Sequence, residues 1–265
     1  MSELQKKLKK ELSKSVIQFL KQENELLNSL MYTSHLESFE TYLEQHDLID
    51  DVFKYLNRNK IDYEKSRKKL IKVDKSMRKV NAGMVYKLYY QNFEELLSNL
   101  IYSIYLIYPK FLEKENDFDQ FEMDSLYSKT TVENIRKIIT EKKVNELIQS
   151  NNIITILKKF KTIFGVDLPL SEDEIKLILF FSMNRNILSQ NNGIINSLYL
   201  SEVKRLDLIN EYQLDENISS KVEKLTVKIQ ATIPKIASKV YEFLVSNVSQ
   251  IEIYSNTKFE LSPQK

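Results

Sequence analysis

The chain has 265 residues, of which 42% are hydrophobic and 29% charged, and its formal net charge at pH 7 is +2. This balance is typical of a globular protein and excludes a disordered chain. With three glycines and four prolines, the sequence has too few turn-forming residues for a β-sandwich, a β-barrel or a Gly-rich phosphate loop. The composition therefore predicts an all-α protein.

Cysteine is absent, and the two histidines are His35 and His46. The chain therefore has no thiol nucleophile and no disulfide, and we expect neither a metal nor a cofactor. The N-terminal residues lack the apolar core of a signal peptide, and no apolar run is long enough to cross a bilayer. We therefore expect a soluble, cytoplasmic protein that does not contact a membrane.

Charge is distributed unevenly in the first half of the chain. Residues 58–79 hold ten Lys and Arg against three acids, and residues 113–124 hold six acids against one Lys. A basic segment of this kind attracts nucleic acid, although a solvated helix face has the same composition.

The first 80 residues predict an N-terminal helical region. An apolar stripe at steps of three, four and seven indicates an amphipathic helix over residues 4–30. A second helix is expected over about residues 38–58, and the basic segment follows it. The stripe consists of Leu4, Leu8, Leu12, Val16, Phe19, Leu20, Leu27 and Leu30.

The strongest helical pattern lies between Tyr86 and Tyr108 and is ended by Pro109. Its apolar residues cover a wide arc, which predicts a helix at the centre of a bundle. Aromatic side chains also stack on bases, but core packing is the favoured interpretation. The residues are Tyr86, Tyr89, Tyr90, Phe93, Leu96, Leu97, Leu100, Ile101, Ile104 and Tyr108.

Several helix ends are predicted further along the chain. Residues 130–133 (Thr-Thr-Val-Glu) and 171–174 (Ser-Glu-Asp-Glu) have the pattern of capping boxes. Gly165 and Gly193 are expected in the left-handed conformation that ends a helix, the second of them after a helix that runs to Asn191 or Asn192.

The C-terminal part of the chain predicts one more long helix. It is expected over residues 218–247, interrupted or kinked at Pro234, and we assign residues 251–265 to an extended tail.

The helix that starts at Ser171 ends in a polar motif. Residues 180–196 have the sequence FFSMNRNILSQNNGIIN, which resembles the signature of the HEPN superfamily (higher eukaryotes and prokaryotes nucleotide-binding), R-[polar]-x-x-x-H followed by Asn and Gly. Arg185 occupies the arginine position, Asn186 the polar position and Gln190 the histidine position, and Asn191 and Asn192 follow. The resemblance covers about residues 84–248.

This resemblance implies an antiparallel HEPN-like helical bundle over residues 81–250 that forms a homodimer. Many members of the superfamily are metal-independent endoribonucleases of toxin–antitoxin, abortive-infection and CRISPR defence systems. The implied catalytic residues are Arg185, Asn186 and Gln190, and the implied RNA-binding residues are Arg185, Asn191 and Asn192. The implied partners are RNA, a second copy of the chain, and an antitoxin or other defence-system protein.

Gln190 changes the chemistry that the motif implies. Glutamine does not titrate near neutral pH, so it lacks the general-base function, which contributes about 10²–10⁴ in rate. We therefore expect weak or lost cleavage, either in a natural pseudo-nuclease or because the catalytic residue has been replaced. The alternative function is a non-catalytic HEPN-like scaffold or regulator that binds a partner protein or a nucleotide.

The spacing of the motif has a geometric consequence. Residues five apart on an ideal helix point about 140° away from each other. Arg185 and Gln190 therefore reach one phosphate only where the helix ends or where two subunits share a site across a two-fold axis.

Structural roles are open for the same residues. Arg185 would pair with an acid such as Glu174 or Glu94, and the asparagines would be plain helix-end residues. On that interpretation the motif is a chance match in a helical interaction protein. A catalytic role for His35 or His46 would require the N-terminal region to fold over the site.

Overall fold

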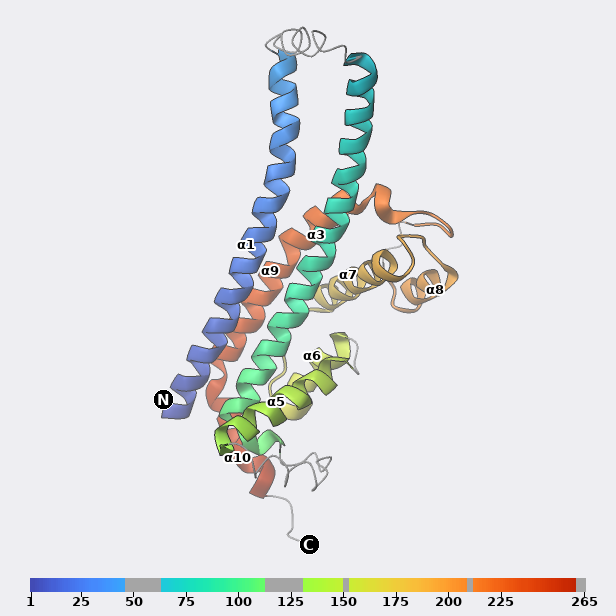
Figure 1. The fold of residues 1–265 in the computed structure, drawn as a ribbon. Coiled ribbons are helices and arrows are strands. Elements are labelled where there is room, and N and C mark those ends of the chain that lie inside the picture. Colours follow the sequence, from blue (N-terminus) through green and yellow to red (C-terminus); the bar gives the residue numbers. More distant parts are fainter. Residues whose placement is uncertain (46–62, 113–130, 150–152, 209–211, 261–265) are drawn as a thin grey trace. The chain divides into compact units, whose positions relative to one another are not determined.

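The computed structural model describes residues 1–45, 63–112, 131–149, 153–208 and 212–260 (Figure 1). Within these ranges the regular elements are all helices, and the only pairing of extended residues is an isolated bridge between Ile194 and Asn217. The predicted all-α class is confirmed.

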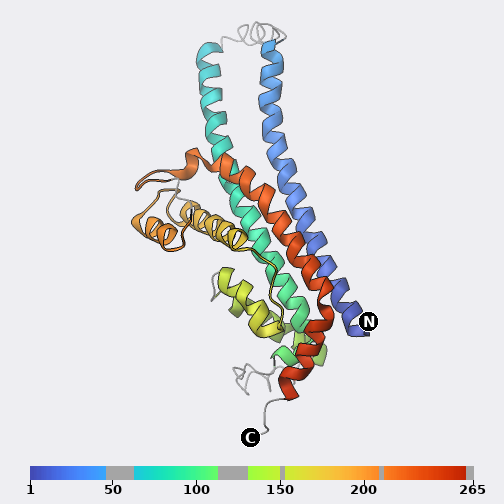
Figure 2. The ribbon, with the colours of Figure 1, turned by 180° about the vertical axis from the view of Figure 1, so that it is seen from behind.

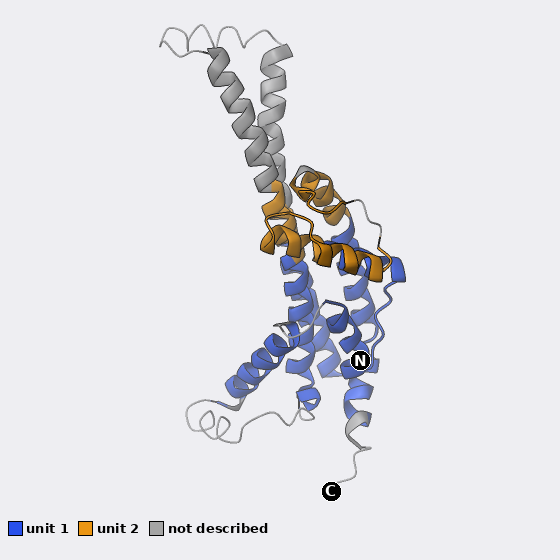
Figure 3. Ribbon diagram, turned by 90° about the vertical axis from the view of Figure 1, so that its right-hand side faces the viewer, with its two compact units in different colours: residues 1–21, 91–182, 232–265 blue, residues 22–90, 183–231 orange. Residues whose placement is uncertain are grey.

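The chain divides into two compact units (Figure 3). Unit 1 consists of residues 1–21, 91–182 and 232–265, and unit 2 of residues 22–90 and 183–231. Four helices contribute residues to both units: α1 (Glu3–Gln45), α3 (Tyr63–Ile107), α7 (Glu172–Gln190) and α9 (Val222–Ser246). The functional division that we place at residue 80 falls inside α3 and stays a prediction.

Helix α1 confirms part of the predicted N-terminal stripe. Leu8, Leu12, Val16 and Phe19 are buried in unit 1, whereas Leu4 and Leu20 are exposed. The second helix expected from residue 38 does not begin there, because α1 continues without a break to Gln45. The rest of that expected helix lies outside the described residues.

Helix α3 joins two segments that the sequence pattern separates. The basic residues from 63 onward and the tyrosine-rich stretch form one helix of 45 residues. All ten residues of the predicted stripe between Tyr86 and Tyr108 are buried, which confirms the core assignment. The helix ends at Ile107, and the 3-10 helix η1 (Pro109–Leu112) follows.

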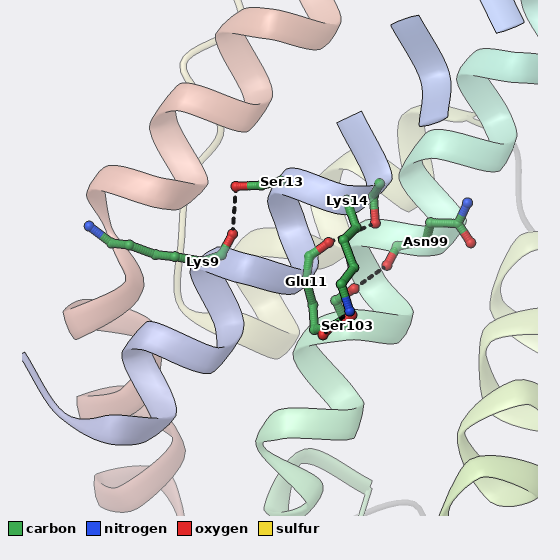
Figure 4. A network of polar contacts seen from close by, with 7 residues as sticks. Lys9, Glu11, Ser13, Lys14, Asn99 and Ser103 are labelled. Atoms are coloured by element: carbon green, nitrogen blue, oxygen red, sulfur yellow. Dashed lines mark hydrogen bonds and ion pairs between the residues drawn. The ribbon is translucent and has the colours of Figure 1, made fainter. Parts of the chain in front are cut away.

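Unit 1 is held together by contacts among α1, α3 and α9, which lie side by side in it (Figure 1; Figure 2). Ser13 of α1 shares a hydrogen bond of 2.8 Å with the Tyr241 hydroxyl of α9. Figure 4 shows that serine hydroxyls in α1 and α3 also donate to carbonyls one turn earlier, Ser13 to Lys9 and Ser103 to Asn99, each at 2.8 Å. These bonds satisfy serine hydroxyls that would otherwise lie against a neighbouring helix.

An aromatic cluster packs helix α6 (Ile153–Phe164) against α3 and η1 in unit 1. Phe164, the last residue of α6, lies edge-on to Tyr105 and to Phe111, with ring centroids 5.2 Å apart in each pair. Gly165 ends α6 with φ of +72°, as predicted, and Tyr254 packs directly over it.

The expected C-terminal tail is wrong for residues 251–260, which belong to helix α10 (Val248–Glu260). Within this segment Ile251 is buried and Ile253 is 61% exposed. The buried residues Val248, Ile251 and Ser255 follow steps of three and four, and α10 contacts η1 and α6. The helical face is therefore set by tertiary contacts.

Two other predicted boundaries shift. Helix α5 (Val132–Gln149) is capped by Thr131, whose Oγ1 accepts from the backbone N–H of Asn134 at 3.4 Å; the cap thus lies one residue later than predicted. Helix α9 begins at Val222, after the 3-10 helix η2 (Ile218–Ser220), and continues through Pro234 without interruption.

Candidate functional site

The start of α7 is fixed by the predicted capping box in unit 1. The backbone N–H of Ser171 donates to Glu174 Oε2 at 2.7 Å, and the backbone N–H of Glu174 donates to Ser171 Oγ at 3.2 Å. Lys239 donates to the same carboxylate at 2.8 Å. These hydrogen bonds, that from Lys239 foremost, hold the pKa of Glu174 below its usual value. Glu174 is thus a cap that also binds α9.

The end of α7 lies in unit 2, where the motif residues are. The last helical residue is Gln190, and Asn192 and Gly193 have φ of +50° and +81°. The backbone N–H groups of Asn191 and Gly193 both donate to the Ile187 carbonyl, at 3.1 and 3.0 Å. The prediction that Gly193 is left-handed is confirmed, and the helix ends one residue before the earlier of the two expected positions.

The loop after α7 is anchored by backbone hydrogen bonds to a distant segment. Ile195 donates to the Glu216 carbonyl and Asp215 to the Ile195 carbonyl, each at 2.9 Å, and Ile218 donates to the Gly193 carbonyl at 2.8 Å. The loop then leads into α8 (Ser197–Arg205), whose N-cap Asn196 accepts from the Tyr199 backbone N–H at 2.8 Å. Hydrogen bonds of the backbone therefore fix the loop between α7 and α8.

A pocket of about 270 Å³ lies between the end of α7 and α8 in unit 2. We call it the amide pocket, because four of its side chains are carboxamides. From α7, Asn186 and Gln190 are four residues apart and share one helix face. The lining residues are Met183, Asn186, Ile187, Gln190, Asn191, Asn196, Leu198, Tyr199 and Glu202.

Three of the five predicted site residues thus meet in one pocket. Asn186 is half-buried, Gln190 is exposed, and the half-buried Asn191 donates through Nδ2 to the Ile194 carbonyl. Asn192 is exposed and does not line the pocket; its carbonyl accepts from Asn217 Nδ2 at 3.5 Å.

Arg185, the fifth predicted residue, is half-buried next to the amide pocket and does not line it. Its Nη1 donates to Asn186 Oδ1 at 3.0 Å, and its Cζ lies 5.6 Å from the centroid of the Tyr90 ring. Such a distance is within the range of a cation–π contact. Arg185 is therefore linked to the pocket through Asn186. Glu174, one of the acids considered as a partner of Arg185, accepts instead from Lys239.

Asn184 holds the motif against the core of unit 2. Its side chain is fully buried, its Oδ1 accepts from the Tyr199 hydroxyl at 3.0 Å, and it also hydrogen-bonds Tyr86. Burial, together with the nearby tyrosines, raises the pKa of Tyr86 well above its usual value. Because Tyr86 belongs to α3 and Tyr199 to α8, this one amide links α7 to both helices.

Glu202 gives the amide pocket a carboxylate that is ion-paired with Arg205. Arg205 donates to it through Nε at 3.1 Å to each carboxylate oxygen. This hydrogen-bonded pair lowers the pKa of Glu202 and raises that of Arg205. Glu202 is consequently ionised at neutral pH and is a weak base.

Several pocket residues were missed by sequence reasoning. Asn196 had a visible signal, since Asn before a helical run is a preferred N-cap. No sequence signal pointed to Leu198, Tyr199 or Glu202. The position of α8 against α7 depends on backbone hydrogen bonds between residues 193–195 and 215–218.

Comparisons with models of known protein families, with curated proteins and with solved structures found no match to this chain. No helix in the described part of the chain is long and apolar enough to span a bilayer. Among the described residues, no cluster of three or more His, Asp or Glu side chains has the arrangement of a metal site.

Proposed function

We propose that this chain is a HEPN-like RNA-binding protein of a prokaryotic defence or toxin–antitoxin type system, of endoribonuclease lineage and active as a homodimer. The observation that carries the proposal is the amide pocket, because motif residues Asn186, Gln190 and Asn191 all line it. The guanidinium of Arg185 donates to Asn186 Oδ1, so a fourth motif residue lies beside the pocket.

Cleavage by this chain is weak or lost. Among the residues that line the pocket, Glu202 and Tyr199 are titratable, but Glu202 has a lowered pKa and the Tyr199 hydroxyl donates to Asn184. Neither is a suitable base for a ribose 2′-hydroxyl. RNA binding is therefore the retained activity, with Arg185 contacting phosphate and the amides of Asn186 and Gln190 supplying hydrogen bonds.

The test is RNA cleavage in EDTA by the full chain and by Gln190→His. Gln213→His is the matched control, because Gln213 is exposed in the same unit and does not line the pocket. We expect Gln190→His to cleave and the control and wild type to cleave weakly or not at all. Absence of cleavage by Gln190→His together with absence of RNA binding by the wild type would refute the proposal.

A mixing experiment tests whether two copies share one site. Because α7 is helical through Gln190, the helix end does not turn residue 190 toward Arg185, which favours a site shared across a two-fold axis. The wild type carries Arg185, and the double variant Arg185→Ala, Gln190→His carries only the histidine. We expect a mixture of the two to cleave RNA although neither does so alone; an inactive mixture combined with an active Gln190→His would place both groups in the same subunit.

The alternative is a non-catalytic regulator that binds a nucleotide or a partner protein. It is favoured by one observation, the absence of a suitable general base among the residues that line the pocket, since Glu202 has a lowered pKa and the Tyr199 hydroxyl donates to Asn184. This function predicts no cleavage by Gln190→His and calorimetric binding of a free mononucleotide that Asn186→Ala abolishes.

A further inference from the structure

The side chains that line the amide pocket indicate which part of an RNA it binds. This inference rests on the proposed RNA-binding function. We propose that the pocket is a subsite for one unpaired nucleobase and that it prefers adenine or cytosine, which carry an amino group at the position of the O4 carbonyl of uracil, over uracil.

The hydrogen-bonding groups of the pocket match the edge of a base. Asn186 Oδ1 is used by Arg185, and Asn196 Oδ1 is used by the Tyr199 backbone. Their Nδ2 groups remain as donors to a ring nitrogen or a carbonyl oxygen of a base, and Gln190 offers a donor and an acceptor at the rim. A carboxamide that uses both groups, as Gln190 does there, pairs with adenine through the amino group and ring nitrogen of the base.

A carboxylate in the lining favours an amino donor. No Lys or Arg is among the lining residues, and the one ionised side chain there is Glu202, which is ion-paired with Arg205 and accepts three hydrogen bonds from it. An ionised carboxylate has about four acceptor sites, so one site is left for an amino group of a ligand. A carboxylate accepts hydrogen bonds from an exocyclic amino group, as it does from cytosine N4. Uracil has carbonyl oxygens at the corresponding positions and would meet Glu202 acceptor to acceptor.

Apolar side chains supply surface for the flat faces of a base. Leu198 is 69% exposed, and Met183, Ile187 and Tyr199 complete the apolar part of the lining. An exposed leucine over a cavity of about 270 Å³ suits a single base and not a longer stretch of nucleic acid. The phosphate is left to Arg185, outside the pocket.

The test measures fluorescence anisotropy of labelled RNA 12-mers with the full chain at one fixed salt concentration. The probes are oligoadenylate, oligocytidylate, oligouridylate and an oligomer of unsubstituted purine riboside, which keeps the purine ring and lacks the amino group. We expect the adenine and cytosine oligomers to bind about ten-fold more tightly than the uracil and purine oligomers.

Glu202→Gln identifies the group responsible, with Glu223→Gln as the matched control because Glu223 is an exposed glutamate of unit 2 that does not line the pocket. We expect the preference to fall to about three-fold or less in Glu202→Gln and to persist in the control. Equal, tight binding of all four RNAs would overturn the base preference and leave the proposed function in place. A preference that Glu202→Gln does not change would overturn the assignment to this pocket, and failure of every RNA to bind would refute the proposed function itself.

Discussion

Replacing Asn184 should reveal how strongly the motif depends on one buried amide. Asn184→Leu keeps the approximate volume but removes the acceptor that the Tyr199 hydroxyl uses at 3.0 Å and the hydrogen bond to Tyr86. Both hydroxyls then lie in buried surroundings without this partner, at about 1–3 kcal/mol for each unsatisfied group. Allowing for partial relaxation, we expect the free energy of unfolding to fall by about 2–4 kcal/mol.

A double-mutant cycle with Tyr199→Phe isolates the hydrogen bond. Tyr199→Phe alone should cost about 1 kcal/mol, and adding it to Asn184→Leu should cost less than it does alone, with a coupling energy of about 1 kcal/mol. The assay is urea unfolding followed by far-UV circular dichroism. Asn145→Leu is the control, since Asn145 is exposed on α5. Additive effects within about 0.3 kcal/mol, or an Asn184→Leu variant as stable as the control, would refute the reasoning.

Three further predictions concern two glycines and a capping box. Gly165→Ala should lower the free energy of unfolding in thermal denaturation by about 2–4 kcal/mol, because φ is +72° and a Cβ would lie 2.6 Å from Cδ2 of Tyr254; Tyr254→Ala in the same chain should restore part of the difference. Gly193→Ala, at φ of +81°, should cost about 1–3 kcal/mol in the same assay and weaken RNA binding, and wild-type stability would contradict the left-handed loop. The lowered pKa of Glu174 means that its stabilising contribution is present above the usual carboxyl pKa and is lost as pH falls through the lower folded value. Glu174→Gln should therefore flatten the loss of stability as pH falls below the usual carboxyl pKa in urea titrations, and an unchanged slope would contradict it.

The parts of the fold that sequence reasoning predicted correctly depend on neighbours in the chain. The buried stripe of α3 is encoded by helical spacing, and the capping box at Ser171 and the left-handed Gly193 are encoded by residues within one or two turns. Helix α10 was not predicted, because it is held against α6 and η1 by contacts between residues that lie far apart in the sequence, such as those of Tyr254 with Gly165 and Phe111.

The candidate site likewise has residues that local sequence patterns predict and residues that they do not. Asn186, Gln190 and Asn191 follow from the motif and share a pocket. The wall opposite them comes from α8, and its position depends on backbone pairs between segments more than 20 residues apart, such as Gly193 with Ile218. No local pattern encodes such a pairing, so Glu202 and its charge were not predicted.

The position of Arg185 limits how the motif acts. Its guanidinium lies over the Tyr90 ring and donates to Asn186, whereas Gln190 opens into the amide pocket. On the proposed function, the two residues therefore contact different parts of a bound RNA, a base in the pocket and a phosphate beside it. Replacing Gln190 by histidine would place a proton acceptor at the rim of the amide pocket. On the proposed function, cleavage then requires the ribose that follows the bound base to reach an arginine, and the mixing experiment identifies the subunit that supplies this arginine.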